Sequence, residues 1–167
     1  KTATIPAEPA SKEQLPPLLQ GFGAVPPLVS DIDLSMDDKF LYVACWGTGE
    51  MLQYDVSNPF QSQLTGKVEI GGIARKKGHP KSKGALLGGP QMVEISRDGR
   101  RVYFTNSLYA SWDEIFYPDG VGAWMTGVSK PSGTSRISAP AGIGRIGARG
   151  AAKAASSTGA PARRATV

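Results

Sequence analysis

The chain has 167 residues, with 19 Lys and Arg, 14 Asp and Glu, and a formal net charge of +5. This length allows one globular domain and excludes a large multidomain enzyme. The charge is uneven, because residues 1–119 hold 12 basic and all 14 acidic residues, whereas residues 120–167 hold 7 basic residues and no acidic one. The basic excess therefore belongs to the tail, and we expect no nucleic-acid partner for the folded part.

The chain has one cysteine, Cys45, and one histidine, His79. A single cysteine excludes an intramolecular disulfide and a multi-cysteine zinc site, and a single histidine excludes a histidine-cluster metal site within this chain. No stretch approaches the roughly 18 consecutive apolar residues of a membrane helix, so no membrane insertion is expected.

Six prolines lie between Lys1 and Pro27. Each removes an amide donor and restricts the residue before it to extended geometry. Residues 1–29 are therefore predicted to form an extended, proline-rich strap.

Two apolar runs separated by a turn signal occur twice in the chain. IDLSMDDKFLYV, residues 32–43, recurs as VEISRDGRRVYF, residues 93–104, at a constant offset of 61 residues. In each copy an apolar run ends at Ser, an Asp-containing turn follows, and a second apolar run begins. Asp98-Gly99 supplies the positive-φ residues that a short hairpin turn prefers. The repeat predicts two β-hairpins, each with a buried tyrosine, Tyr42 or Tyr103.

Each hairpin is followed by a further strand signal, at residues 50–56 and less clearly at residues 120–125. Antiparallel sheets of about four strands, repeated along the chain, are typical of β-propeller blades. We predict an all-β fold with about two WD40-like propeller blades over residues 30–125. Since two blades cannot close a ring, the missing blades are expected to be needed for stable folding.

Residues 126–167 are predicted to form a low-complexity basic tail. Of the 13 aromatic residues in the chain, only Trp124 lies beyond Gly120. Such a composition buries too little apolar surface to offset the entropy of an ordered chain. The sequence therefore predicts a disordered tail, or the product of a frameshift between Trp124 and Ser129 in a GC-rich gene.

Residues 31–73 and 88–125 closely resemble the selenium-binding protein family, and within it the bacterial methanethiol oxidase type. Phrases such as GGPQM, TNSLY and FYPDG carry the resemblance, which extends over most of residues 4–125. The chain is thus expected to be part of a longer family member.

The resemblance implies a propeller of seven blades. It also implies copper-dependent oxidation of methanethiol, a small thiol, to formaldehyde, hydrogen sulfide and hydrogen peroxide, and binding of selenium through a cysteine. Bacterial members of this type are often exported, so a periplasmic location is expected for the full-length protein, with a cytoplasmic one as the alternative. The alternative function is a non-catalytic scaffold that binds selenium, copper or a protein partner.

One departure from the family pattern concerns the metal. Eukaryotic members tend to carry His-Gly-Asp where this chain has Thr48-Gly49-Glu50, so a metal-ligand role at that position does not carry over. A copper site needs several nitrogen or sulfur ligands, which one His and one Cys do not supply. This segment alone is therefore expected to be inactive.

Cys45 and His79 are the two candidate site residues. Cys45 follows an apolar run and precedes glycines, so it is either a selenium or metal ligand or a small buried hydrophobe. His79 lies in RKKGHPKSKG, where it is either a metal ligand or a solvated loop histidine. The carboxylates of SWDEIFYPDG are either a polar site or turn formers, with Trp112 and Tyr117 as packing anchors.

Overall fold

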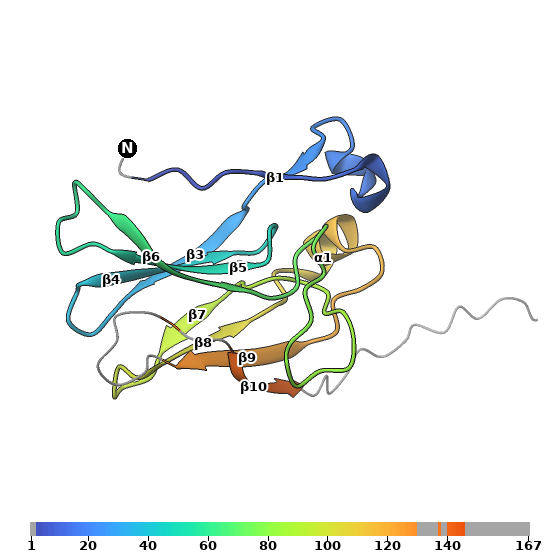
Figure 1. The fold of residues 1–167 in the computed structure, drawn as a ribbon. Helices are drawn as coiled ribbons and strands as arrows, with labels where there is room; N and C mark the ends of the chain where they lie inside the picture. Colours follow the sequence, from blue (N-terminus) through green and yellow to red (C-terminus); the bar gives the residue numbers. More distant parts are fainter. Residues whose placement is uncertain (1–2, 130–136, 138–139, 146–167) are drawn as a thin grey trace, which may run out of the picture.

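The computed structural model describes residues 3–129, 137 and 140–145, and the regular secondary structure of these residues is mostly β (Figure 1). Two four-stranded antiparallel sheets make up the body, with a third sheet of two short strands and one helix, α1 (Ala110–Phe116). Sheet 1 contains β3 (Val29–Leu34), β4 (Phe40–Cys45), β5 (Glu50–Asp55) and β6 (Gln63–Glu69) in that spatial order. Sheet 2 contains β7 (Val93–Ile95), β8 (Arg101–Thr105), β9 (Trp124–Ser129) and β10 (Pro140–Arg145) in that order. The prediction of an all-β fold is confirmed.

Both predicted hairpins form, as β3–β4 and β7–β8. In each turn the serine hydroxyl lies within hydrogen-bond distance of the turn aspartate, 2.6 Å for Ser35–Asp37 and 2.5 Å for Ser96–Asp98. One residue per turn has a positive φ, Asp38 in the first copy and Gly99 in the second. The repeated sequence is therefore a repeated turn, in which serine and aspartate hold the bend.

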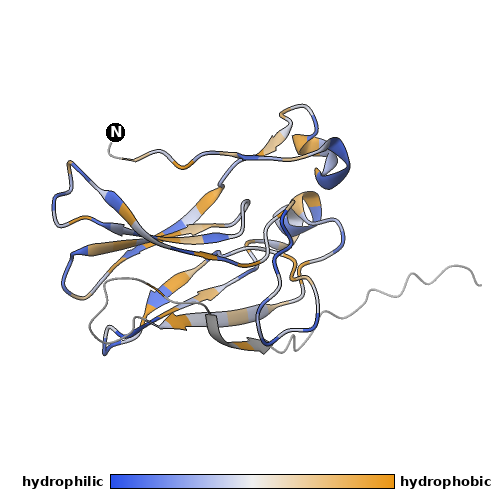
Figure 2. Cartoon of the chain, in the orientation of Figure 1, coloured by the Kyte–Doolittle hydropathy of each residue, from blue (hydrophilic) through white to orange (hydrophobic). Residues whose placement is uncertain are grey.

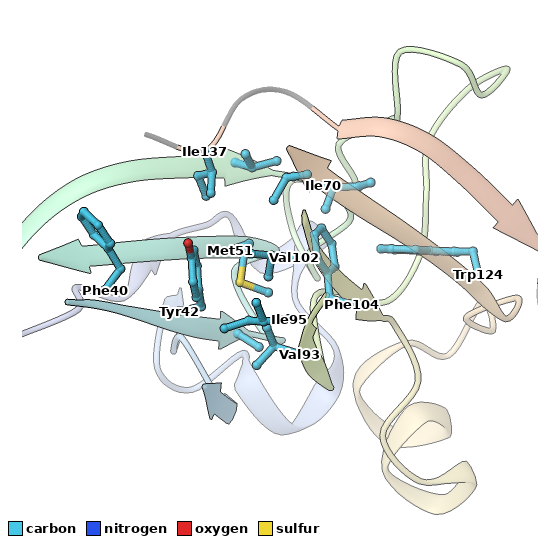
Figure 3. Close-up of a cluster of buried hydrophobic side chains, with 13 residues drawn as sticks. Phe40, Tyr42, Met51, Ile70, Val93, Ile95, Val102, Phe104, Trp124 and Ile137 are labelled. Carbon is cyan, nitrogen blue, oxygen red and sulfur yellow. The ribbon is translucent and has the colours of Figure 1, made fainter. Parts of the chain in front are cut away.

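The two sheets pack face to face around a shared apolar core (Figure 3). Strand residues alternate between faces, so Tyr42 and Met51 of sheet 1 meet Val93 and Phe104 of sheet 2. Figure 2 shows apolar residues on the strands of both sheets. Tyr42 is buried as predicted, whereas Tyr103 is only half-buried, because it lies on the opposite face of its strand from Phe104.

Two hydrogen bonds connect the first strands of the two sheets. The Ser30 hydroxyl donates to the Gln91 carbonyl at 3.0 Å, and the Val93 amide donates to the Asp31 carboxylate at 2.8 Å. These bonds fix β3 beside the start of β7, although the two strands are separated by about sixty residues of chain.

The strap of residues 1–29 is not extended throughout. It folds back as a short hairpin of β1 (Glu8–Pro9) and β2 (Ala24–Val25), with 3₁₀ turns at Lys12–Gln14 and Pro17–Leu19 between them. A Ser11–Gln14 capping box starts the first turn, and Pro17 suits the first position of the second. Proline therefore starts a helical turn here as well as favouring extended chain.

The predicted boundary at Met125 falls inside a strand. β9 continues to Ser129, and β10 pairs with it in antiparallel register. Val128 is buried against the core, and Gly127 packs on the Tyr103 ring. Small residues thus complete this sheet, because the neighbouring strand supplies the bulk. Ile137 is also buried in the core, and its amide donates to the Gln53 side chain at 2.9 Å. The remaining residues of the predicted tail lie outside the described residues.

Candidate functional site

Cys45, the last residue of β4, has no solvent exposure and packs with Val43, Leu52 and Tyr54 on the face of sheet 1 that points away from sheet 2. Burial, reinforced by the charge of Glu50, raises the pKa of its thiol to about 12. Metal and selenium chemistry needs the thiolate, which this environment disfavours. The geometry matches the interpretation of Cys45 as a small buried hydrophobe, and selenium binding there stays a prediction.

We expect the Cys45 thiol to be unreactive in the native protein. At pH 8, iodoacetamide should label it slower than in denaturant by on the order of 100-fold or more, because both access and thiolate are lacking. Mass spectrometry of native and urea-unfolded samples measures the ratio. Equal labelling rates in the two samples would contradict this placement of the side chain.

His79 lies in the long loop between β6 and β7, and it is 3% exposed, so it is not the solvated loop histidine of the second interpretation. Its Nδ1 accepts a hydrogen bond from the Lys81 amide at 2.9 Å. The proton of the neutral ring therefore sits on Nε2, which is buried and has no hydrogen-bond partner among the described residues. In this arrangement neither ring nitrogen offers a free lone pair to a metal.

The free energy of unfolding should depend on pH through His79. Burial, and then the charge of Lys81, lower the pKa of the folded imidazole below 6.5, its ordinary value. Because the unfolded chain binds the proton more readily, stability is fully present above the unfolded pKa and falls as pH drops through it towards the folded pKa. Urea unfolding at pH 5 and pH 7.5 should show a smaller loss in His79→Gln than in the unmodified protein; identical losses would contradict the assignment.

A buried carboxylate, Glu50, occupies the start of β5 beside Cys45. It accepts hydrogen bonds from the Thr48 hydroxyl at 2.9 Å and the Lys67 ammonium at 3.2 Å, and pairs with the Arg75 guanidinium at 3.4 Å. Thr48, Gly49 and Glu50 thus form a polar corner of sheet 1, called here the Glu50 corner. The Glu50 carboxylate is fully paired, with Thr48, Lys67 and Arg75. A fully paired carboxylate is poorly suited to act as a general base.

Arg75 connects this corner to the strap. Its guanidinium also pairs with Glu8 of β1 at 3.1 Å and with Glu69 of β6 at 3.3 Å. The hydrogen bond from Lys67 lowers the pKa of Glu69, so that carboxylate stays charged at neutral pH. The cluster holds the strap, β5 and β6 together, and its role is positional.

Of the predicted carboxylates near α1, Asp113 holds a turn, whereas Glu114 and Asp119 are exposed. Asp113 is buried and accepts hydrogen bonds from the Ser107 hydroxyl at 2.5 Å and the Leu108 amide at 3.0 Å. Asp119 pairs with Lys76 at 3.1 Å. Tyr117 is a buried packing anchor, as predicted, whereas Trp112 is 48% exposed and covers only one side of the helix.

The residues present do not fit the copper that the family resemblance implies. Copper in a protein takes several nitrogen or sulfur donors. Within the described part of the chain, no group of three His, Cys, Asp or Glu side chains is placed to hold a metal ion. Cys45 is a buried thiol on sheet 1, and His79 holds its proton on Nε2 in a separate loop. No catalytic step is therefore derived through copper from these residues.

Sequence reasoning missed the partners of Glu50. Arg75 is visible in the sequence only as one of several basic loop residues, and Glu8 lies 67 residues away from it. No local signal pairs residues at such a separation. The burial of His79 was missed for a different reason: its neighbours in sequence are mostly polar, which is typical of a solvated loop.

Comparisons with known proteins give a consistent group of relatives. The model of the family described as "56kDa selenium binding protein (SBP56)" matches residues 1–139. The chain is 43% identical over 111 residues to a methanethiol oxidase of Homo sapiens and to selenium-binding protein 2 of Mus musculus. It is 37% identical over 111 residues to selenium-binding protein 1 of Arabidopsis thaliana.

A solved structure is also similar to this fold. The hypothetical selenium-binding protein from Sulfolobus tokodaii superimposes with a TM-score of 0.81 at 51% identity, over 88% of this chain and 32% of that chain. The alignment with the human and mouse relatives covers 57% of this chain. It spans 24% of the length of those relatives. No helix formed by the described residues is long and apolar enough to cross a membrane.

Proposed function

Because this chain belongs to the 56 kDa selenium-binding protein family, we propose that it is part of a methanethiol oxidase. The reaction converts methanethiol, oxygen and water into formaldehyde, hydrogen sulfide and hydrogen peroxide. The observation that carries the proposal is the 43% identity to relatives named for this activity, over 111 residues. The substrate of the proposed reaction is a small thiol.

Copper is the cofactor of this proposal, and it would supply the redox chemistry. Its ligands are proposed to come from parts of the full-length protein other than the described residues, because these do not assemble a donor set. Our proposal for this segment is that it forms part of the scaffold around the active site. This segment contributes two packed sheets to that scaffold. Its Glu50 corner holds the strap in place through Arg75.

We further propose that sheets 1 and 2 are neighbouring blades of a β-propeller. Each sheet has four antiparallel strands in sequential order, and each presents its first strand to the other sheet. The outer face of sheet 1 carries the apolar cluster around Val43 and Tyr54, with an apolar groove of about 560 Å³ beside it. A preceding blade would cover this face as sheet 1 covers sheet 2.

Methionine oxidation tests the blade arrangement. Met92 and Met125 flank Thr105 on the outer face of sheet 2 and are 55% and 42% exposed, whereas Met36 lies in a turn and is 69% exposed. In the full-length protein a following blade should protect Met92 and Met125 from added hydrogen peroxide, while Met36 oxidises. Buried Met51 serves as the internal control, because it should stay reduced. Equal oxidation of Met36, Met92 and Met125 would contradict the arrangement.

The activity is tested on the full-length gene product, purified with and without copper. Copper-dependent consumption of methanethiol, with hydrogen sulfide and peroxide produced in step, supports the oxidase. Absence of turnover in a protein shown to be fully loaded with copper would overturn it.

The second candidate is a non-catalytic scaffold that binds selenium, copper or a protein partner. The observation favouring it is that the Glu50 carboxylate is fully paired with Thr48, Lys67 and Arg75. Copper bound without turnover of any small thiol would support this function.

A further inference from the structure

An open pocket lies where the loop between β6 and β7 folds back beside the end of β6, the edge strand of sheet 1 (Figure 1). Its volume is about 860 Å³. β6 contributes Lys67 and Glu69 to the walls, and the loop contributes Lys77, His79 and Ser82. The pocket is thus built from one strand and the loop that directly follows it.

His79 gives this pocket a buried hydrogen-bond donor. The residue is 3% exposed, and its Nδ1 accepts from the Lys81 amide at 2.9 Å, so the neutral ring carries its proton on Nε2. That N–H has no acceptor among the residues that the structure describes. A buried polar group without a partner is destabilising, and beside a pocket it marks a place where a ligand can supply the missing partner. Such a ligand must offer an acceptor atom.

The loop around His79 is strongly basic. Residues 70–93 contain five Lys and Arg and no Asp or Glu. Arg75 and Lys76 are paired with carboxylates of other segments, each at 3.1 Å. The other three form no ion pair with any described residue: Lys77, Lys81 and Lys83. An excess of positive charge of this kind attracts an anion.

Glu69, a carboxylate in the lining, does not cancel this charge. It lies 2.8 Å from Lys67 Nζ and 3.3 Å from the Arg75 guanidinium, so its own charge is already balanced. Lys67 and Lys77 bring two positive charges to the lining and Glu69 brings one negative charge, which leaves one positive charge in excess. The lining therefore favours an anionic ligand over a neutral one.

We propose that this pocket binds a small oxyanion, with one oxygen accepting from His79 Nε2–H and the negative charge paired with Lys77. Phosphate and carboxylate groups both present such oxygens, and lysine binds them as a point charge. Pro80 and Lys81 are exposed, so a small movement of the loop lets the ligand reach the buried Nε2. Because the ion pair is exposed to water, the expected affinity is roughly millimolar.

Ring ¹⁵N NMR of the full-length protein, labelled in histidine and held at one pH, tests the proposal. Phosphate and acetate are titrated separately, with the ionic strength kept constant by potassium chloride. The signals of His79 are identified as those missing from His79→Phe. A saturable shift of the His79 Nε2 resonance is expected with at least one anion. Saturation by phosphate alone would indicate a phosphoryl ligand, and saturation by acetate would indicate a carboxylate.

A pair of lysine substitutions tests the charged contact. Lys77→Gln should weaken binding about threefold or more, as expected for the loss of one exposed ion pair. The matched control is Lys76→Gln, which removes the same charge from the adjacent residue. Lys76 lies outside this lining and pairs with Asp119, so its substitution should leave the affinity unchanged.

Absence of a saturable Nε2 shift with either anion would overturn the proposal without reference to any variant, and so would the same shift with potassium chloride alone. Equal affinities of Lys77→Gln and Lys76→Gln would also overturn it, because only a general attraction of charges would then be measured. The NMR readout does not involve turnover, so its outcome is independent of the proposed oxidase activity.

Discussion

Trp46→Ala should lower the free energy of unfolding by about 4 kcal/mol, as expected for removal of a fully buried large aromatic side chain. Trp46 has no solvent exposure and makes edge-to-face contacts with Phe116 and Tyr117, at ring distances of 5.5 and 4.9 Å. Its indole N–H donates to the Asn106 carbonyl at 2.9 Å, so the substitution also leaves a buried acceptor without a donor. Urea unfolding followed by circular dichroism measures the loss.

The matched control is Trp112→Ala, in the same cluster of aromatic side chains. Trp112 is 48% exposed and contacts Phe116 at a ring distance of 5.8 Å. Its loss should cost less than about 1 kcal/mol, because little apolar area returns to water. Comparable losses for the two tryptophans would contradict the central position that Trp46 has in the structure.

Asn106→Leu is the second substitution with a large expected effect, again about 4 kcal/mol. The side chain is 1% exposed, and its Nδ2 lies within hydrogen-bond distance of three carbonyls, those of Leu87, Val121 and Gly122, at 3.0–3.1 Å. Its Oδ1 accepts from the Trp124 amide at 2.9 Å. Leucine has a similar volume but can neither accept from the buried Trp124 amide nor donate to the Val121 and Gly122 carbonyls, while the Leu87 carbonyl keeps its hydrogen bond from the Trp124 indole N–H. Each buried group left without a partner costs roughly 1–3 kcal/mol.

Asn58→Leu is the control for this second substitution. Asn58 is exposed, and its side chain accepts a hydrogen bond from the Phe60 amide at 3.1 Å. Water replaces that bond, so the expected change is below about 1 kcal/mol. A loss at Asn106 no larger than that at Asn58 would show that the Asn106 side chain does not hold the loops before sheet 2 and after α1.

The hairpins were predictable because their determinants are local. Ser35 and Asp37, like Ser96 and Asp98, act on the same turn that contains them. Gly88-Gly89-Pro90 leads towards β7 and passes close to Trp46. A Cβ on Gly89 would lie 2.2 Å from the Trp46 carbonyl oxygen, so the second glycine allows two backbones to touch.

Other features depend on contacts that sequence reasoning does not see. β9 and β10 are rich in glycine and small residues, and they form strands because β8 offers a paired edge to β9, which in turn pairs with β10. In the sequence, Glu50 is an ordinary strand residue. Only the fold shows that Arg75 and Lys67 lie beside its carboxylate. His79 looks solvated in sequence but becomes buried when the loop folds back on its own Ser82. In the first two cases the contacting residues are distant in sequence. In the third they lie in the same loop, and the contact forms only when that loop adopts its folded conformation.

The candidate site shows the same division. The sequence identifies Cys45 and His79 as the donors to examine, because they are the sole cysteine and histidine of the chain. Their environments come from the structure alone: a thiol whose pKa burial raises to about 12, and an imidazole whose Nδ1 lone pair is already used. We therefore propose that this segment is a scaffold of the oxidase and that the metal ligands lie in other parts of the full-length protein.

The most direct test of that account is the turnover of methanethiol by the copper-loaded full-length protein, compared with its Cys45→Ala variant. We expect copper-dependent formation of hydrogen sulfide and peroxide by both proteins, at rates within about twofold, because the buried thiol packs against Leu52 and Tyr54 and burial keeps it protonated. Loss of copper and of turnover in a folded Cys45→Ala protein, or no turnover by either protein, would contradict it.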